Sequence, residues 1–258
     1  MTSGGREAIR IAMPWLAMAF FLVVWELACV VFDIQEIILP RPTKVFVVFV
    51  QRFDILMAYC WDTLWTTVLG FAIAIAGGVL LGVMIGASPL IYSGLYPLLI
   101  AFNAVPKVAI VPILMIWVGV GATPAVITAF VISFFPIVVN VATGLATIEP
   151  EMIDVLNSLG ASRYEILRKV GLPRAMPYLF ASLKVAITLA FIGSVISETV
   201  GGNRGIGFLM LSAGARNDAP TTFAGLFAIA IMGVAMYAVC ALVEKRMTRW
   251  AFRGQLVS

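Results

Sequence analysis

Six long stretches of mostly apolar residues alternate with more polar connections along the chain. A helix needs about 20 consecutive apolar residues to cross the hydrocarbon layer of a membrane. The pattern therefore predicts an all-α membrane protein with six transmembrane helices, organised as one transmembrane domain over residues 1–258. The predicted spans cover residues 13–32, 64–87, 95–119, 125–148, 176–196 and 222–243.

Prolines interrupt the third stretch, at Pro97, Pro106 and Pro112. Proline lacks a backbone N–H, so it is tolerated in a spanning helix only where neighbouring groups or water satisfy the freed carbonyl. We therefore expect this span to be kinked and buried inside the helix bundle, away from lipid.

Two further patterns concern packing. Gly78, Gly82 and Gly86 stand four residues apart on one face of the second span, a spacing that lets two helices approach closely. Residues 43–61 have Arg52 and Asp54 at their middle and apolar residues at helical spacing around them. This second pattern predicts an amphipathic helix, either at the membrane interface or packed on the bundle.

The composition agrees with a membrane protein and removes several functions. Hydrophobic residues make up 62% of the chain and charged residues 12%, where soluble proteins average about 25% charged. The net charge of +4 is dispersed, which argues against nucleic-acid binding. The chain has no His, so imidazole metal sites and Ser-His or Cys-His catalysis are excluded. The three Cys share no metal-type spacing and are interpreted as packing thiols.

The distribution of Lys and Arg predicts the orientation. If both termini are inside, the inside segments hold ten Lys and Arg residues and the outside segments hold five. Cytoplasmic loops are enriched in these residues. We therefore expect a multi-pass protein with both termini in the cytoplasm.

The connection 149–173 is the longest on the cytoplasmic side of this topology. Pro150 suits the first turn of a helix, and an apolar stripe follows it at Met152, Val155, Leu156 and Leu159. These residues predict a short amphipathic helix.

A turn and a second short helix follow. Gly160 stands where a helix C-terminal cap is expected, and Ser162 with Glu165 forms the pattern of a capping box. Gly171 and Pro173 are expected to end the second helix. The segment is therefore a rigid elbow, which fits either a docking site for a partner or a re-entrant or surface hairpin without one.

This elbow resembles the "EAA" loop of ABC importer permeases, written E-A-A-x3-G-x9-I-x-L-P. The matching residues are Asp154, Val155, Leu156, Gly160, Val170, Gly171, Leu172 and Pro173. Asp154 replaces Glu, Val155 and Leu156 replace the two Ala, and Val170 replaces Ile. Other segments resemble the nitrate/sulfonate/taurine branch of these permeases: Leu39-Pro40 with Pro42, the prolines 106 and 112 before residues 117–121, and Glu198 before a glycine-rich loop.

The resemblance implies a type I ABC importer permease fold in a bacterial inner membrane. It also implies a small polar or anionic solute; nitrate, sulfonates, taurine and thiamine or flavin precursors all fit the branch. The expected partners are two copies of a cytoplasmic ATPase, a periplasmic or lipid-anchored binding protein, a second copy of this chain and membrane lipid. The first helix of the elbow would be a coupling helix that docks in a groove of the ATPase.

No G-x-x-x-x-G-K-[ST] sequence occurs in the chain, so it carries no P-loop. By the resemblance, ATP and Mg²⁺ bind the ATPase, and this chain holds no cofactor, metal or catalytic residue. The glycine-rich segment 201–207 is interpreted as a turn at the mouth of the pathway and not as a nucleotide loop.

The candidate site residues form two groups. The coupling group is Glu151, Asp154, Ser158, Gly160, Ala161, Ser162, Arg163 and Pro173. The pathway or gate group is Lys107, Asn140, Ser194, Ser197 and Glu198, because polar groups in or near spans usually face the bundle interior. For Glu198 the alternative is an interfacial carboxylate, and for Asn140, Ser194 and Ser197 it is a helix–helix contact.

Two other function classes remain open at this point. One is a secondary transporter or channel that works alone, although no internal repeat of the kind typical of such transporters is visible. The other is a membrane enzyme, for which the spans offer no paired carboxylates and no nucleophile site.

Overall fold

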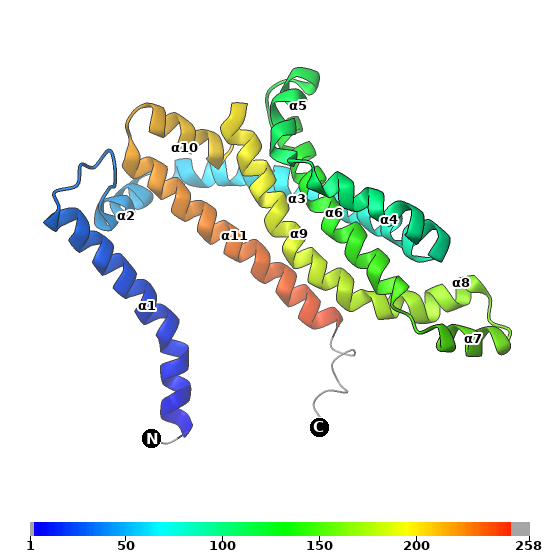
Figure 1. Cartoon of the computed structure of the whole chain (residues 1–258). Coiled ribbons are helices and arrows are strands. Elements are labelled where there is room, and N and C mark those ends of the chain that lie inside the picture. The colour runs from blue at the N-terminus through cyan, green and yellow to red at the C-terminus, as the bar shows by residue number, and fades with distance from the viewer. Residues whose placement is uncertain (1–2, 249–258) are drawn as a thin grey trace. The chain divides into compact units, whose positions relative to one another are not determined.

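The computed structural model describes residues 3–248, with side chains from residue 12 onward, and contains no strand among them (Figure 1). The helices are α1 Ser3–Val31, α2 Pro42–Gln51, α3 Phe53–Gly86, α4 Pro89–Ala104, η1 Lys107–Ile110, α5 Val111–Val118, α6 Ala122–Ala146, α7 Pro150–Ser158, α8 Arg163–Ile166, η2 Leu167–Gly171, α9 Leu172–Gly201, α10 Ile206–Ala215 and α11 Ala219–Met247. The predicted all-α fold is confirmed. Residues 1–2 and 249–258, the two ends predicted to be cytoplasmic, lie outside the described residues.

The predicted spans correspond to observed helices. Five helical segments are long and apolar enough to cross a membrane: Ala12–Val31, Phe53–Gly86, Ala122–Ala146, Arg163–Ala215 and Ala219–Met247. The pair Pro89–Ala104 and Lys107–Val118 meets the same criterion as one bent span. Hydrophobic length alone therefore located the spans.

The bent span confirms the predicted kink. The two helices meet at 73°, and Val105 at the break is extended, as a residue before proline tends to be. The expectation that the span is buried is wrong for the single chain, because α4 and η1 have no buried residue and α5 has only Val111 and Leu114. Helices α6 and α9 pack against this span, yet large apolar side chains such as Ile116 and Trp117 remain exposed.

The predicted amphipathic helix over residues 43–61 is wrong as a single element. Helix α2 ends at Gln51, and the longer α3 begins at Phe53. At the start of α2, the Glu26 carboxylate accepts hydrogen bonds from the Thr43 amide and hydroxyl, at 3.0 and 2.9 Å. The chain turns at Arg52, whose guanidinium bonds groups at the start of α11.

The chain divides into two compact units, residues 1–58 with 209–229 and residues 59–208 with 230–258. In the first unit, Trp25 of α1 packs against Phe223 and Phe227 of α11, with ring centroids 5.7 and 6.2 Å away. This aromatic contact fastens the first helix to the last one within the unit.

The second unit contains the main core, in which α6 packs along α9. The core residues are Ala74, Ile137, Val141, Leu145, Ala175 and Ala186. The glycines of α3 lie directly on α6: a Cβ added at Gly82 would stand 2.7 Å from the Cβ of Val141, and one at Gly86 2.8 Å from the Ala142 carbonyl oxygen. The close approach predicted from the glycine spacing is confirmed.

Candidate functional site

The first candidate site is the elbow formed by α7 and α8. Helix α7 has no buried residue, although three of the four residues of the predicted apolar stripe lie on it. Val155 is 60% exposed and Leu159, its C-cap, is 79% exposed, whereas Met152 and Leu156 are half-buried. An apolar edge is therefore presented outward at the end of α7.

The turn after α7 has the geometry that the glycine predicts. Gly160 has a φ of +81°, and its amide donates to the Asn157 carbonyl at 2.9 Å. The Ala161 amide donates to the Leu156 carbonyl at 3.0 Å. These two bonds form a Schellman motif, which satisfies carbonyls at the helix end.

The capping box at the start of α8 is also confirmed. The Ser162 amide donates to Glu165 Oε2 at 3.0 Å, and the Glu165 amide donates to Ser162 Oγ at 3.3 Å. Lys169 extends the motif with an ion pair to Glu165 at 3.3 Å. Both sides of the elbow are thus fixed by local bonds, so the turn is rigid.

The predicted end of the second helix at Gly171 and Pro173 is wrong. Helix α8 continues through a π-helical turn, Leu167–Gly171, directly into α9 (Figure 1). The Leu172 amide donates to the Leu167 carbonyl five residues back, where an α-helix would use four. Pro173 follows in the first turn of α9, and the wider turn accommodates its missing N–H. The elbow is therefore continuous with a spanning helix.

The remaining coupling candidates lie on this elbow without tertiary contacts that assign them a role. Glu151, Asp154 and Arg163 are exposed. Ser158 Oγ donates to the Asp154 carbonyl at 2.9 Å within its own helix. Their side chains are therefore directed to solvent and available to a partner.

The second candidate site is a buried polar group, here called the Glu198 cluster, made of Thr63 and Thr66 of α3 with Ser194 and Glu198 of α9. Thr63 Oγ1 donates to Glu198 Oε2 at 2.9 Å, and Thr66 Oγ1 bonds Ser194 Oγ at 3.3 Å. Glu198 is 4% exposed, and no ion pair to it occurs in the part of the chain that the structure describes. Neutral donors alone therefore stabilise this buried acidic side chain.

The glycine-rich loop after α9 folds over the Glu198 carboxyl group. The Gly207 amide donates to Glu198 Oε2 at 3.0 Å, and the Ile206 amide donates to Thr63 Oγ1 at 2.9 Å. Gly205 has a φ of +91°, and a Cβ there would lie 2.1 Å from Glu198 Cδ. Only glycine fits at this position, because the loop backbone lies directly against the carboxyl group.

The pathway candidates are only partly brought together. Ser194 and Glu198 join the cluster, and Ser197 is buried with no hydrogen-bond partner among the described residues. Lys107 lies apart: its Nζ bonds the carbonyl and side-chain oxygens of Asn103, at 3.0 and 2.8 Å. Asn140 Nδ2 donates to the Pro136 carbonyl in its own helix, at 2.8 Å.

Thr63 and Thr66 were not among the residues predicted from the sequence. A signal was present, because Thr63, Thr66 and Thr67 recur at intervals of three and four residues on one face of a span. Ser194, Ser197 and Glu198 recur at the same intervals. Two polar stripes with one spacing indicate helices that face each other.

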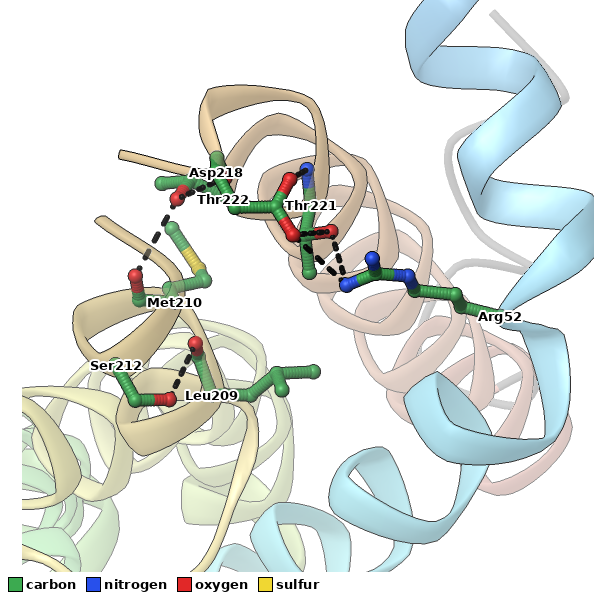
Figure 2. Close-up of polar contacts among 7 residues, drawn as sticks. All are labelled: Arg52, Leu209, Met210, Ser212, Asp218, Thr221 and Thr222. Carbon is green, nitrogen blue, oxygen red and sulfur yellow. Dashed lines mark hydrogen bonds and ion pairs between the residues drawn. The ribbon is translucent and has the colours of Figure 1, made fainter. Parts of the chain in front are cut away.

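A third polar group lies in the first unit, around Asp218 at the start of α11 (Figure 2). Arg52 Nη1 donates to Asp218 Oδ2 at 2.8 Å and to Thr221 Oγ1 at 2.7 Å. The Thr221 amide donates to Asp218 Oδ1 at 3.1 Å, as in a helix N-cap. Partial burial alone would raise the pKa of Asp218, but the Thr221 hydrogen bonds and the Arg52 charge together hold it below its ordinary value. The Arg52 charge is thus neutralised by a carboxylate and serves a structural contact.

Comparison with known proteins places this architecture among transport components. A sequence profile described as "Binding-protein-dependent transport system inner membrane component" matches residues 78–249. The riboflavin transport system permease protein RibX of Chloroflexus aurantiacus is 31% identical, over 91% of this chain and 88% of its own length. The formylaminopyrimidine transport permease protein ThiX of Halalkalibacterium halodurans is 26% identical, over 92% and 95%. The taurine transport system permease protein TauC of Escherichia coli is 27% identical, over 90% and 87%.

Among solved structures, the MetNI methionine ABC transporter in an inward-facing conformation contains a chain of similar fold. The TM-score is 0.64 at 21% sequence identity, and the match covers 79% of this chain and 99% of the other. At this identity the likeness concerns the fold alone.

Proposed function

We propose that this chain, which belongs to the family of binding-protein-dependent transport system inner membrane components, pairs with a second copy of itself and with two cytoplasmic ATPase subunits to import a small polar or anionic solute. The observation that carries the proposal is the elbow: a fixed turn with an outward apolar edge, continuous with a spanning helix. A rigid lever transmits a displacement that a flexible loop would absorb. A transporter that works alone has no use for such a lever.

Helix α7 is the proposed contact with the ATPase. Val155 and Leu159 offer exposed apolar surface of the kind that a groove on a partner buries. Asp154 is exposed beside them and is proposed to face a cation of the ATPase. Movement of α7 would pass through α8 and the π-helical turn to α9, where the bundle changes from inward-open to outward-open.

The proposed second copy accounts for the exposed surface of the bent span. Helices α4 and η1 have no fully buried residue in the single chain, and Ile116 and Trp117 of α5 are 81% and 74% exposed. Lipid covers some of this apolar surface, and a partner copy would cover the rest. Lys107, at the break of this span, and Asn140 of α6 would then face a pathway shared by the two copies.

The solute is proposed by class only. The relatives' names refer to riboflavin, formylaminopyrimidine and taurine, which share polarity but no common shape. A binding protein outside the membrane, periplasmic or lipid-anchored, would select among such solutes. Lys107 would add a favourable charge for an anionic one.

The remaining parts of the proposal concern topology and nucleotide. Both termini and the elbow would lie on the cytoplasmic side, in agreement with the Lys and Arg distribution. ATP and Mg²⁺ would bind the ATPase, and this chain would contribute none of the hydrolytic residues. The Glu198 cluster would lie at the outer end, as part of a gate.

Reconstitution tests the proposal directly. The chain would be copurified with its ATPase and placed in liposomes, and uptake would be measured with and without ATP inside and binding protein outside. Uptake should require both. Asp154→Lys should lower copurification of the ATPase by about tenfold, roughly 1.4 kcal/mol, while Asp154→Glu retains it. Uptake by the permease without the ATPase would overturn the proposal in favour of a transporter that works alone.

A further inference from the structure

We propose that Thr63 is a positioning residue for the outer gate, and that its hydroxyl fastens Glu198 of α9 to the first turn of α10. This inference rests on the proposed transport function. The fastening, here called the Thr63 latch, consists of the Thr63 hydroxyl, the Glu198 carboxyl group and the amides of Ile206 and Gly207. It closes when α3 and α9 lie together and opens when they separate.

One hydroxyl takes part in two hydrogen bonds of the latch. Thr63 Oγ1 donates to Glu198 Oε2 at 2.9 Å and accepts from the Ile206 amide at 2.9 Å. The same carboxylate oxygen accepts from the Gly207 amide at 3.0 Å. Thr63 is therefore the link between three helices, and its loss would remove two hydrogen bonds at once.

The hydrogen bonds of the latch also cap the start of α10. The first amides of a helix have no acceptor within that helix and need one from outside. Ile206 and Gly207 supply the first amides of α10, and their acceptors come from α3 and α9. A carboxyl group at this end also interacts favourably with the helix dipole. The start of α10 is thus capped by two other helices and depends on their separation.

The closed arrangement leaves no free space between the loop and α9. A Cβ at Gly202 would stand 2.7 Å from Glu198 Cα, and one at Gly207 2.7 Å from the Val195 carbonyl oxygen. The loop backbone therefore touches α9 directly, so a small separation breaks the hydrogen bonds. Packed contacts of this kind favour two discrete arrangements over continuous deformation.

The Thr63 hydroxyl is buried and has an alternative acceptor within its own helix. Thr63 is fully buried, and its hydroxyl has a second acceptor, the Tyr59 carbonyl, at 3.3 Å. When the latch opens, the Thr63 hydroxyl can donate its hydrogen bond to the Tyr59 carbonyl within α3, whereas the Ile206 amide loses its acceptor. A buried donor without a partner costs free energy, so the hydrogen bond from the Ile206 amide to Thr63 contributes most to the stability of the closed latch.

The test uses the complete complex of permease, ATPase and binding protein in liposomes. Thr63→Val keeps the shape of the side chain and removes the hydroxyl. It should raise ATP hydrolysis in the absence of binding protein about fivefold and lower the solute imported per ATP by a similar factor. Thr63→Ser should restore wild-type values, and Thr63→Cys, a weak donor, should lie between them. Thr188→Val, which removes an exposed hydroxyl bonded within α9, is the matched control and should not change either quantity.

The outcomes distinguish a failure of the Thr63 latch from a failure of the proposed transport function. If the wild-type complex shows no ATP-driven uptake, the proposed function itself fails. If the wild type transports and Thr63→Val imports as much solute per ATP as the wild type does, the latch is wrong and the transport function stands. If Thr63→Val does not assemble, the order of the Ser and Cys variants decides: equal coupling in both overturns the latch, and graded coupling supports it.

Discussion

Lys184 of α9 and Glu244 of α11 form an ion pair in which Nζ and Oε2 lie 2.7 Å apart. Their side chains are 25% and 20% exposed, so both charges are largely removed from solvent. Lys184 therefore joins two helices. The helix that continues from the elbow is thereby tied to the last helix of the chain.

The ion pair predicts a charge-swap result. Lys184→Glu and Glu244→Lys should each destabilise the protein by roughly 2 kcal/mol, because one charge is left without its partner. At this chain length the loss corresponds to a fall in Tm of about 5 °C. The double swap should recover most of the loss, and Lys245→Glu on the exposed side of α11 should have little effect. Thermal unfolding in detergent measures all four, and additive losses in the double swap would show that the pair contributes nothing.

We expect replacement of Gly160 to impair the coupling of the permease to its ATPase. Its φ of +81° costs a β-branched residue about 1–2 kcal/mol, so Gly160→Val should lower the population of the native turn roughly tenfold. Copurification of the ATPase and solute uptake should fall together, while membrane insertion is unchanged. Gly160→Asn is the matched control, since Asn tolerates a positive φ far better than a β-branched residue does. Normal uptake by Gly160→Val would remove the elbow from the coupling mechanism.

Lys107 predicts a change in solute handling. Its ammonium group caps the end of α4 through Asn103 and lies 5.8 Å from the centre of the Phe135 ring. Lys107→Met removes the charge, and KM for an anionic solute should rise about tenfold, or roughly 1.4 kcal/mol. Lys107→Arg should retain transport. Unchanged uptake kinetics in Lys107→Met would mean that the side chain serves only the helix end.

Asp218 predicts a dependence of stability on pH. Its pKa in the folded protein is lowered, despite partial burial, by Thr221 and Arg52. A lowered folded-state pKa stabilises the protein above the unfolded-state pKa of about 4. That contribution is lost as the pH falls through the folded-state pKa. Asp218→Asn should therefore be less stable than the wild type at pH 7, and the difference should shrink as the pH falls below about 4. Asp54→Asn, which removes an exposed carboxylate, is the control; a difference that does not shrink on acidification would exclude titration of Asp218 as the cause.

The features that the sequence predicted well are those set locally or by hydrophobic length. The spans follow from runs of apolar residues, and the turn at Gly160 and the box at Ser162 follow from bonds between near neighbours. The end of α8 was misplaced, because Pro173 removes one N–H and a π-helical turn absorbs that loss without breaking the helix. Burial of the bent span was misjudged, because exposure depends on how many neighbours a single chain supplies.

In the Glu198 cluster, the residues of α9 could be predicted from the sequence and those of α3 could not. Glu198 and Ser194 are conspicuous as polar groups within a span, so they were identified from their own positions. Thr63 was not, because its role depends on the register in which α3 packs against α9. Helical periodicity gives the face of each helix and leaves the register undetermined, so the pair became visible only in three dimensions.

The π-helical turn at Leu167–Gly171 also has an angular consequence. Each residue of an α-helix advances about 100° around its axis, so one extra residue in a turn changes the azimuth of everything beyond it by roughly that amount. The turn therefore sets the rotation of α8 and α7 about the helix axis, relative to the face of α9. Pro173 helps to preserve that rotation. A regular α-helical turn in place of the π-helical one would require the backbone N–H that proline lacks. We expect the elbow to bend little, so that its orientation toward the proposed ATPase is fixed by the rotation about the helix axis that the π-helical turn introduces.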